Sequence, residues 1–297
     1  IDSNTLTDAY YSGIYSYYYA YYPSISFNTI KSRSNTNSTY YGIYTYYYTT
    51  VDTMQSNKIY VTSTSTAYGM RLYGFQNSDM NSNARGPMFV ANNEINIQCS
   101  GTIIGIYAYG GSNYSRFDII NNSIFTSGST STNYGLYFDP STTSGYKSTV
   151  FNNHIHLQTT STAYPICFPN ISYADTMYCS LDYNNYCTSG TESVVYIGSS
   201  SYNTLSSWQS SGYNQDIHAV NIAPVYLDSL TSLKYVYNTN LLSPQITGVE
   251  RDITGRIRSL SSSIGAYESD YKDLAIDSIV YPNYGEVFCQ NNDIPVT

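Results

Sequence analysis

The stretch Val90-Ala-Asn-Asn-Glu-Ile-Asn-Ile-Gln-Cys-Ser-Gly-Thr-Ile-Ile-Gly-Ile-Tyr107 contains both elements of a repeat that decides the fold. The first element is an Asn followed two residues later by an aliphatic residue, and it occurs at Asn4, Asn28, Asn57, Asn93, Asn122 and Asn153, with a weaker copy at Asn185. The second is a Gly or Pro followed by an apolar residue, and it lies 9 to 14 residues further on, at Gly13, Gly42, Gly69, Gly105, Gly135 and Pro165. Two elements that recur together predict a solenoid.

The residues around each Asn alternate between apolar and polar, which is the pattern of a β-strand. An apolar residue lies three positions before the Asn at Ile25, Met54, Val90, Ile119 and Val150. Another lies two positions after it at Leu6, Ile30, Ile59, Ile95, Ile124 and Ile155. We therefore predict an all-β, right-handed parallel β-helix, with coils stacked about 4.8 Å apart and equivalent residues in register.

The repeated Asn residues are expected to form a ladder at one corner of the helix. Asn tolerates left-handed backbone angles at a sharp bend, and stacked side-chain amides can hydrogen-bond to one another. This structural role is assigned to Asn28, Asn57, Asn93, Asn122 and Asn153.

Tyrosines dominate the outward side of the strands that begin near the second element. Alternation turns one column outward at Tyr15, Tyr44, Arg71, Tyr107, Tyr137 and Cys167. A second column follows two residues later at Tyr17, Tyr46, Tyr73, Tyr109, Asp139 and Pro169. The tyrosines form either a stacking surface for polysaccharide or aromatic ladders that stabilise the sheet without a ligand, and the second interpretation is the simpler one.

Ionisable residues that could support catalysis are few. Lys58, Glu94 and His154 share one repeat position, and His156 lies two residues further along. Glu94 and His154 would be two coils apart, about 10 Å, which is too far for a direct acid–base pair. Lys58 and Glu94 are more simply a surface ion pair on adjacent coils. No catalytic residue, metal site or cofactor is predicted, and Asp139, Asp175 and Asp182 are too scattered in sequence to indicate calcium.

Composition restricts the class of protein. The chain of 297 residues has only 11% charged residues, a net charge of −8 and 38 tyrosines. Its 12 Lys and Arg residues are scattered singly, which argues against nucleic-acid binding. No apolar run is long enough for a membrane span, and no signal peptide or initiator Met is present, so we expect a soluble piece of a longer protein. The five cysteines fit either buried thiols or disulfides.

The C-terminal third departs from the repeat. Its most specific features are Asp252-Ile-Thr-Gly-Arg-Ile-Arg258 and Ile264-Gly-Ala-Tyr-Glu268. Following Asn-x-Ile coils, they resemble the ending of secreted right-handed β-helix proteins of Bacteroidota. The resemblance implies a secreted or cell-surface protein and a C-terminal cap that closes the helix. We expect Arg258 and Glu268 to pair and to hold this segment over the open end.

The sequence thus predicts three regions. Residues 1–200 form the coils, and residues 201–270 form the last coils and the cap. Residues 271–297, which include Cys289, resemble the first strands of a truncated immunoglobulin-like domain.

The first functional hypothesis is a noncatalytic stalk or adhesin that binds polysaccharide and continues into flanking domains of the same protein. The alternatives are a polysaccharide lyase or glycoside hydrolase of the β-helix class, whose catalytic groups converge from separate loops, and a purely structural filament.

Overall fold

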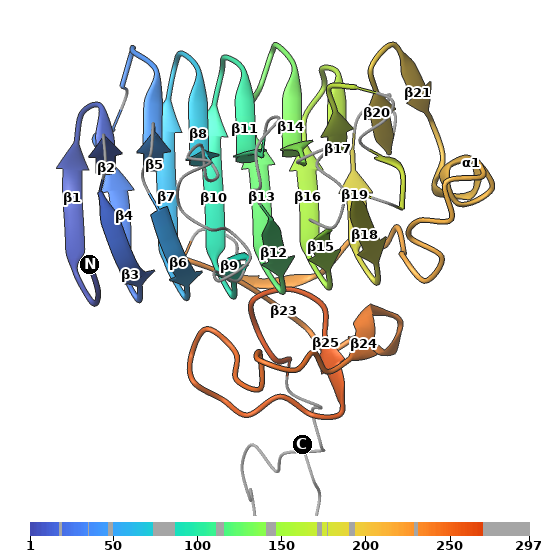
Figure 1. Cartoon of the computed structure of the whole chain (residues 1–297). Helices are drawn as coiled ribbons and strands as arrows, with labels where there is room; N and C mark the ends of the chain where they lie inside the picture. Colours follow the sequence, from blue (N-terminus) through green and yellow to red (C-terminus); the bar gives the residue numbers. More distant parts are fainter. Residues whose placement is uncertain are drawn as a thin grey trace, which may run out of the picture.

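The computed structural model describes residues 1–17, 20–34, 36–46, 50–73, 87–110, 116–140, 147–170, 174–176, 178–189, 194–228 and 231–269. Its body is a parallel β-solenoid, in which consecutive strands pass to three different sheets in turn (Figure 1). The all-β parallel β-helix predicted from the repeat is therefore confirmed, while the hand of the winding stays a prediction. The immunoglobulin-like strands predicted for 271–297 lie outside the described residues.

The three sheets run along the length of the solenoid. The first sheet consists of β1 (Thr5–Ala9), β4 (Thr29–Ser32), β7 (Lys58–Ser63), β10 (Glu94–Cys99), β13 (Ser123–Ser127), β16 (His154–Gln158) and β19 (Asn185–Thr188). The second consists of β2 (Ser12–Tyr17), β5 (Tyr40–Tyr46), β8 (Ala67–Tyr73), β11 (Ile103–Tyr109), β14 (Asn133–Asp139), β17 (Ala163–Phe168), β20 (Val195–Ile197) and β21 (Ser200–Tyr202). The third consists of β3 (Tyr21–Ser26), β6 (Thr50–Gln55), β9 (Met88–Ala91), β12 (Phe117–Ile120), β15 (Ser148–Phe151) and β18 (Cys179–Asp182).

The strand register places equivalent repeat positions on top of one another. In the first sheet Ile95 pairs with Ile59 on one side and with Ile124 on the other. In the third sheet Val90 pairs with Met54 and with Ile119. All six side chains are buried, because each column points into the space between the sheets. The repeat therefore builds one continuous hydrophobic core.

The two sequence elements recur together because they touch across this core. A Cβ atom placed on Gly105 would lie 2.6 Å from Cγ2 of Ile124 and 2.5 Å from the carbonyl oxygen of Gly135. Real Cβ atoms do not approach other atoms so closely, so only glycine fits here while Ile124 keeps its place. The glycine of one coil and the Asn-x-Ile element of the next are thus a matched pair.

The asparagines form a continuous ladder of side-chain hydrogen bonds. In each step Nδ2 of one Asn donates to Oδ1 of the next, over distances of 2.9 to 3.1 Å. The ladder consists of Asn4, Asn28, Asn57, Asn93, Asn122, Asn153 and Asn184. The last rung is Asn184 instead of the predicted Asn185, whose side chain bonds to His154 and to the carbonyl oxygen of Ile222.

The left-handed residues at this corner are not the ladder asparagines themselves. Positive φ angles of 53° to 58° occur one position earlier, at Phe27, Ser56, Asn92, Asn121 and Asn152. The expectation that the ladder asparagines take up the bend is therefore wrong by one residue. The bend belongs to the preceding residue, and the ladder Asn ties neighbouring coils together.

The C-terminal part of the chain first crosses the end of the last coil and then turns back. Residues 203–216 include α1 (Leu205–Gln209), whose Trp208 is buried. Residues 222–228 and 231–269, here called the return segment, contain β22 (Tyr226–Asp228), β23 (Ser232–Tyr235), a 3₁₀ helix (Thr239–Leu241), β24 (Leu242–Pro244) and β25 (Ser261–Ser263). Figure 1 shows the return segment alongside the solenoid, below the middle coils.

Contacts of Arg258 and Glu268 correct the predicted position of this ending. The two side chains do pair, with Nη1 of Arg258 3.5 Å from Oε2 of Glu268, and both are buried. However, Nη2 of Arg258 donates a 2.7 Å hydrogen bond to Oδ1 of Asn92, and the backbone N–H of Gly265 donates to the carbonyl oxygen of Asn152. Both asparagines lie at the ladder corner of the middle coils, so the pair holds the return segment against the side of the solenoid, not over its open end.

Candidate functional site

The outward side of the second sheet carries the predicted tyrosines. Strand register aligns Tyr15 with Tyr44, Arg71, Tyr107, Tyr137 and Cys167, and it aligns Tyr17 with Tyr46 and Tyr73 with Tyr109 and Asp139. Pro169 follows the end of β17 and does not continue the second column. We call the outward tyrosines of this sheet, together with Arg71, the tyrosine face.

The structure adds a third column that the sequence interpretation missed. It consists of Tyr41, Tyr68, Ile104, Tyr134 and Tyr164. Each of these residues immediately precedes the Gly or Pro of the second element, and this position could have revealed the column. The tyrosine face is therefore wider than two ladders.

Most rings on this face pack against one another. The ring centroids of Tyr107 and Tyr137 are 5.1 Å apart with an interplanar angle of 23°, and those of Tyr41 and Tyr68 are 5.0 Å apart with an angle of 20°. Such stacking uses the flat faces of the rings and contributes about 0.5 to 1.5 kcal/mol per pair. Burial raises the pKa of Tyr134 to about 12, so its hydroxyl stays protonated at neutral pH.

Exposure changes along the face. Tyr15 and Tyr17 are 48% and 52% exposed, whereas Tyr44 on the next strand is only 7% exposed. Both exposed rings belong to β2, the first strand of the sheet, which has a neighbouring strand on one side only. Among the described tyrosines of this face, only those of β2 are exposed, and the others are half-buried or buried.

Arg71 lies in the centre of the tyrosine face. Its guanidinium carbon is 5.1 to 5.6 Å from the centroids of five rings, those of Tyr41, Tyr44, Tyr68, Tyr73 and Tyr107. Nη1 donates to the hydroxyl of Tyr41 over 3.1 Å, and Nη2 donates to the hydroxyl of Tyr73 over 3.0 Å. Cation–π contacts of this kind stabilise a guanidinium without neutralising its charge.

Arg71 has no salt-bridge partner in the part of the chain that the structure describes. Within the described residues, no carboxylate lies within 4.0 Å of its guanidinium. The face therefore combines phenol hydroxyls with one fixed cation that can attract an anionic group from solution.

The ionisable residues considered for catalysis lie on the first sheet, and the return segment covers them. Glu94 and His154 are fully buried. Oε1 of Glu94 accepts a 3.0 Å hydrogen bond from the backbone N–H of Leu233, and Oε2 accepts from the hydroxyl of Tyr267. Lys58 lies over the ring of Tyr267 at 5.8 Å. The predicted surface ion pair of Lys58 and Glu94 is thus wrong, because the carboxylate is bound by the return segment.

The two histidines are held neutral under the same segment. Nε2 of His154 lies 3.0 Å, and Nδ1 of His156 lies 3.2 Å, from the hydroxyl of Tyr226. Burial lowers the pKa of His154 to about 3, helped by the nearby His156, and burial lowers the pKa of His156 to about 4. Both act as packing and hydrogen-bonding groups and are covered from the solvent side.

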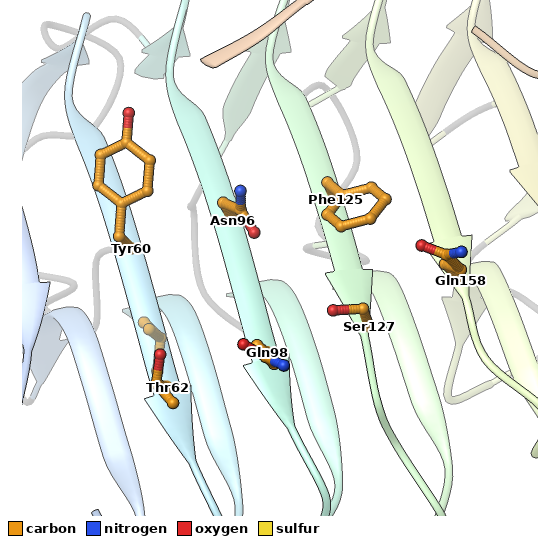
Figure 2. Close-up of a pocket in the computed structure, with 8 residues that line it drawn as sticks. Tyr60, Thr62, Asn96, Gln98, Phe125, Ser127 and Gln158 are labelled. Carbon is orange, nitrogen blue, oxygen red and sulfur yellow. The ribbon is translucent and has the colours of Figure 1, made fainter. Parts of the chain in front are cut away.

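A shallow groove remains open on the same sheet beside the return segment. Figure 2 shows its lining side chains next to one another on four neighbouring strands. One row contains Tyr60, Asn96 and Phe125, and the other contains Thr62, Gln98, Ser127 and Gln158. These residues follow the ladder Asn by three and by five positions, a signal that the sequence contained but that the interpretation did not use.

Asp182 and His218 bring a carboxylate and an imidazole into direct contact, an arrangement that many catalytic sites also use. Oδ2 of Asp182 is 2.8 Å from Nδ1 of His218, and Oδ1 accepts from the backbone N–H groups of Tyr183 and His218. The imidazole stacks on Tyr183 with an interplanar angle of 7°. These contacts tie the loop around His218 to the last strand of the third sheet.

The described residues were also compared with the requirements of metal binding and of thiol chemistry. Across the described residues, no group of three or more His, Cys, Asp or Glu side chains is placed to hold a metal ion. Cys99, Cys167, Cys179 and Cys187 are buried free thiols, and burial raises the pKa of Cys167 to about 12. Of the two alternatives for these four cysteines, buried thiols are correct, while Cys289 lies outside the described residues.

Comparisons with known proteins do not assign a family. No family model, curated protein or solved structure matches the chain. No helix in the described ranges has the length and apolar character needed to cross a membrane.

Proposed function

We propose that this chain is a noncatalytic segment of an extracellular surface protein, acting as a rigid stalk that adheres to polysaccharide through the tyrosine face. The parallel solenoid supports the stalk, since its hydrogen-bonded coils and continuous core make a stiff, elongated body. The secreted location and the relationship to surface proteins of Bacteroidota belong to the same proposal and rest on the Asp252 to Glu268 motif.

The main observation that supports adhesion is the environment of Arg71. A guanidinium held among five tyrosine rings, with no salt-bridge partner in the described residues, favours an acidic polysaccharide that carries carboxylates. The neighbouring phenol groups supply hydrogen bonds to sugar hydroxyls, and the exposed rings of Tyr15 and Tyr17 supply apolar area.

Catalysis is not part of the proposal, because the groups that could support it are otherwise engaged. Glu94 and His154 are fully buried beneath the return segment. Their polar atoms already bind Leu233, Tyr267 and Tyr226, so a polymer on the surface does not reach them.

The test is binding of an oligogalacturonate hexamer to the full chain, measured by calorimetry. Replacing Arg71 with Gln should weaken binding at least tenfold, because a charge-assisted hydrogen bond contributes about 1.5 to 3 kcal/mol. The matched control is Lys147→Gln, at the exposed position just before β15 of the third sheet, which removes the same charge elsewhere. Equal binding by the Arg71 variant would reject the tyrosine face as the site.

A structural filament segment is the second candidate, and ring stacking favours it. Rings such as Tyr107 and Tyr137 already use their faces on each other, which stabilises the sheet without a ligand. Failure of the chain to bind any acidic or neutral oligosaccharide would support this candidate.

A further inference from the structure

The groove on the first sheet has the side-chain chemistry of a sugar site. Its outer row contains two amides and two hydroxyls, those of Gln98, Gln158, Thr62 and Ser127 (Figure 2). Within the described part of the chain, none of these four side chains has a hydrogen-bond partner, and both glutamines are exposed. Each amide can donate and accept, so the row is free to bind the hydroxyl groups of a carbohydrate.

The inner row provides an aromatic floor that is fixed in place. The hydroxyl oxygen of Tyr60 lies 3.0 Å from the carbonyl oxygen of Thr231 and 3.2 Å from Oε1 of Glu94, and its single hydrogen can be donated to either acceptor. The ring of Phe125 packs edge-on against Tyr226 and His156, at centroid distances of 5.7 and 5.2 Å. Since the return segment orders these side chains before any ligand arrives, little conformational entropy is lost on binding.

The groove runs across the coils. Gln98 and Gln158 occupy equivalent positions two strands apart, with Ser127 between them, so their backbones are about 10 Å apart by strand spacing. A second hollow continues from Ser127 and Gln158 over the neighbouring turn, where its lining consists of Gly128, Ser129, Thr130, Thr159, Thr160 and Ser189. A long, repeating ligand fits this arrangement better than a small molecule.

The charges around the groove indicate which class of ligand it can bind. Among the described residues, no charged side chain lines either hollow. One cation, Lys31, lies over the ring of Tyr60 at 5.5 Å, at the edge of the inner row. Uronate or sulfate groups would therefore find no ion-pair partner along the row of glutamines, whereas neutral sugar hydroxyls match its amides and hydroxyls.

We propose that this groove is a binding site for a neutral polysaccharide, whose chain lies across the coils with its hydroxyls on the exposed amides of Gln98 and Gln158. The site is distinct from the tyrosine face, because it lies on the first sheet instead of the second. It extends the proposed adhesive function to a second, uncharged class of polymer, but it does not depend on binding at Arg71.

The experiment measures binding of cello-, manno- and xylohexaose to the full chain by calorimetry, with the galacturonate hexamer as the acidic probe. The groove variant combines Gln98→Ala with Gln158→Ala, and both positions are exposed, so the fold is retained. The control variant is Ser180→Ala on the third sheet, and the face variant is Arg71→Gln. Circular dichroism on each variant checks the fold.

We expect at least one neutral hexamer to bind, the groove variant to lose at least tenfold in affinity, and the face and control variants to match the parent. Loss of neutral binding in the face variant alone would overturn the groove, and so would the absence of binding by all three neutral hexamers. The galacturonate arm reports on the tyrosine face separately, so failure of one site is distinguishable from failure of the other.

Discussion

The side chain of Asn184 donates a 2.9 Å hydrogen bond from Nδ2 to Oδ1 of Asp216, so the row of ladder amides ends on a carboxylate. The other oxygen of Asp216 accepts from the hydroxyl of Tyr186 and from Nε1 of Trp208. Asp216 is fully buried, and this burial raises its pKa from 3.8 to about 6, although the three donors favour the charged form. The end of the last coil thus contains a carboxyl group that titrates in a mildly acidic range.

The raised pKa predicts how Asp216 contributes to stability. The folded state holds the proton more tightly than the unfolded state, so the contribution is fully present below about pH 4 and is lost as the pH rises through about 6. Two pH units correspond to about 3 kcal/mol. Asp216→Asn should remove this dependence. Urea unfolding of parent and variant between pH 4 and 7 measures it, and parallel stability profiles would contradict the prediction.

The histidines under the return segment predict the opposite trend. The pKa of His156 is lowered to about 4, so the unfolded state takes up the proton first, and stability falls as the pH drops from about 6.5 to about 4. The loss is at most about 3 kcal/mol for this residue. His156→Phe retains an aromatic ring against Tyr226 and Phe125 and should reduce the acid sensitivity.

The measurement for His156 is the unfolding free energy at pH 4.5 and at pH 7.5. The difference between these values should be smaller in the Phe variant than in the parent. His218 is 56% exposed, so His218→Phe serves as a control that changes a histidine outside this cluster. A Phe variant at position 156 that loses stability on acidification as steeply as the parent would show that this imidazole is not the acid-sensitive group.

The ladder predicts a large stability effect at an interior rung. Asn93→Ala leaves the backbone N–H and Nδ2 of Asn57 without their acceptor, and it removes the donors to Met54 and Asn122. Each buried polar group left unpaired costs about 1 to 3 kcal/mol, so a loss of more than about 3 kcal/mol is expected. Asn221→Ala, at an exposed position, should change stability by less than about 0.5 kcal/mol. Similar denaturation midpoints for the two variants would disprove a structural role for the ladder.

The solenoid was predictable because its columns consist of the same residue types at a fixed spacing. Ile95 lies on Ile59 and Ile124 as the repeat requires, and Arg71 lies between Tyr44 and Tyr107 in one column. The single displaced rung arises because Tyr186, and not an aliphatic residue, lies two positions after Asn184, so the Asn-x-aliphatic pattern does not select this Asn. The repeat pattern predicts a contact correctly wherever the contacting residue lies at the equivalent position of the neighbouring coil.

The burial of the first sheet was not predictable in the same way. Glu94 is bound by Leu233 and Tyr267, which are 139 and 173 residues away and belong to no repeat. Alternation correctly placed Glu94 and His154 on the outward side of the strand, but it carries no information about what covers that side. The two rows of the groove lie at fixed distances from the ladder asparagines, but the repeat contains no information about the return-segment contacts that order Tyr60 and Phe125.

Glu94 provides the sharpest test of how the return segment is held. In Glu94→Ala the N–H of Leu233 and the hydroxyl of Tyr267 lose a buried acceptor, which should weaken the attachment of β23 by about 1 to 3 kcal/mol for each group. Glu94→Gln keeps an acceptor for Leu233. Burial raises the pKa of Glu94, so a neutral amide also avoids part of the cost of burying a charge there.

Hydrogen exchange of the Leu233 amide distinguishes these variants. Its protection should fall at least tenfold in the Ala variant and stay near the parental value in the Gln variant. The amides of β13, which bond to neighbouring strands of the first sheet, should remain protected in both. If the Leu233 amide keeps full protection in the Ala variant, then the Arg258 contacts with Asn92 and Glu268 alone suffice to hold the segment, and Glu94 is only a covered residue.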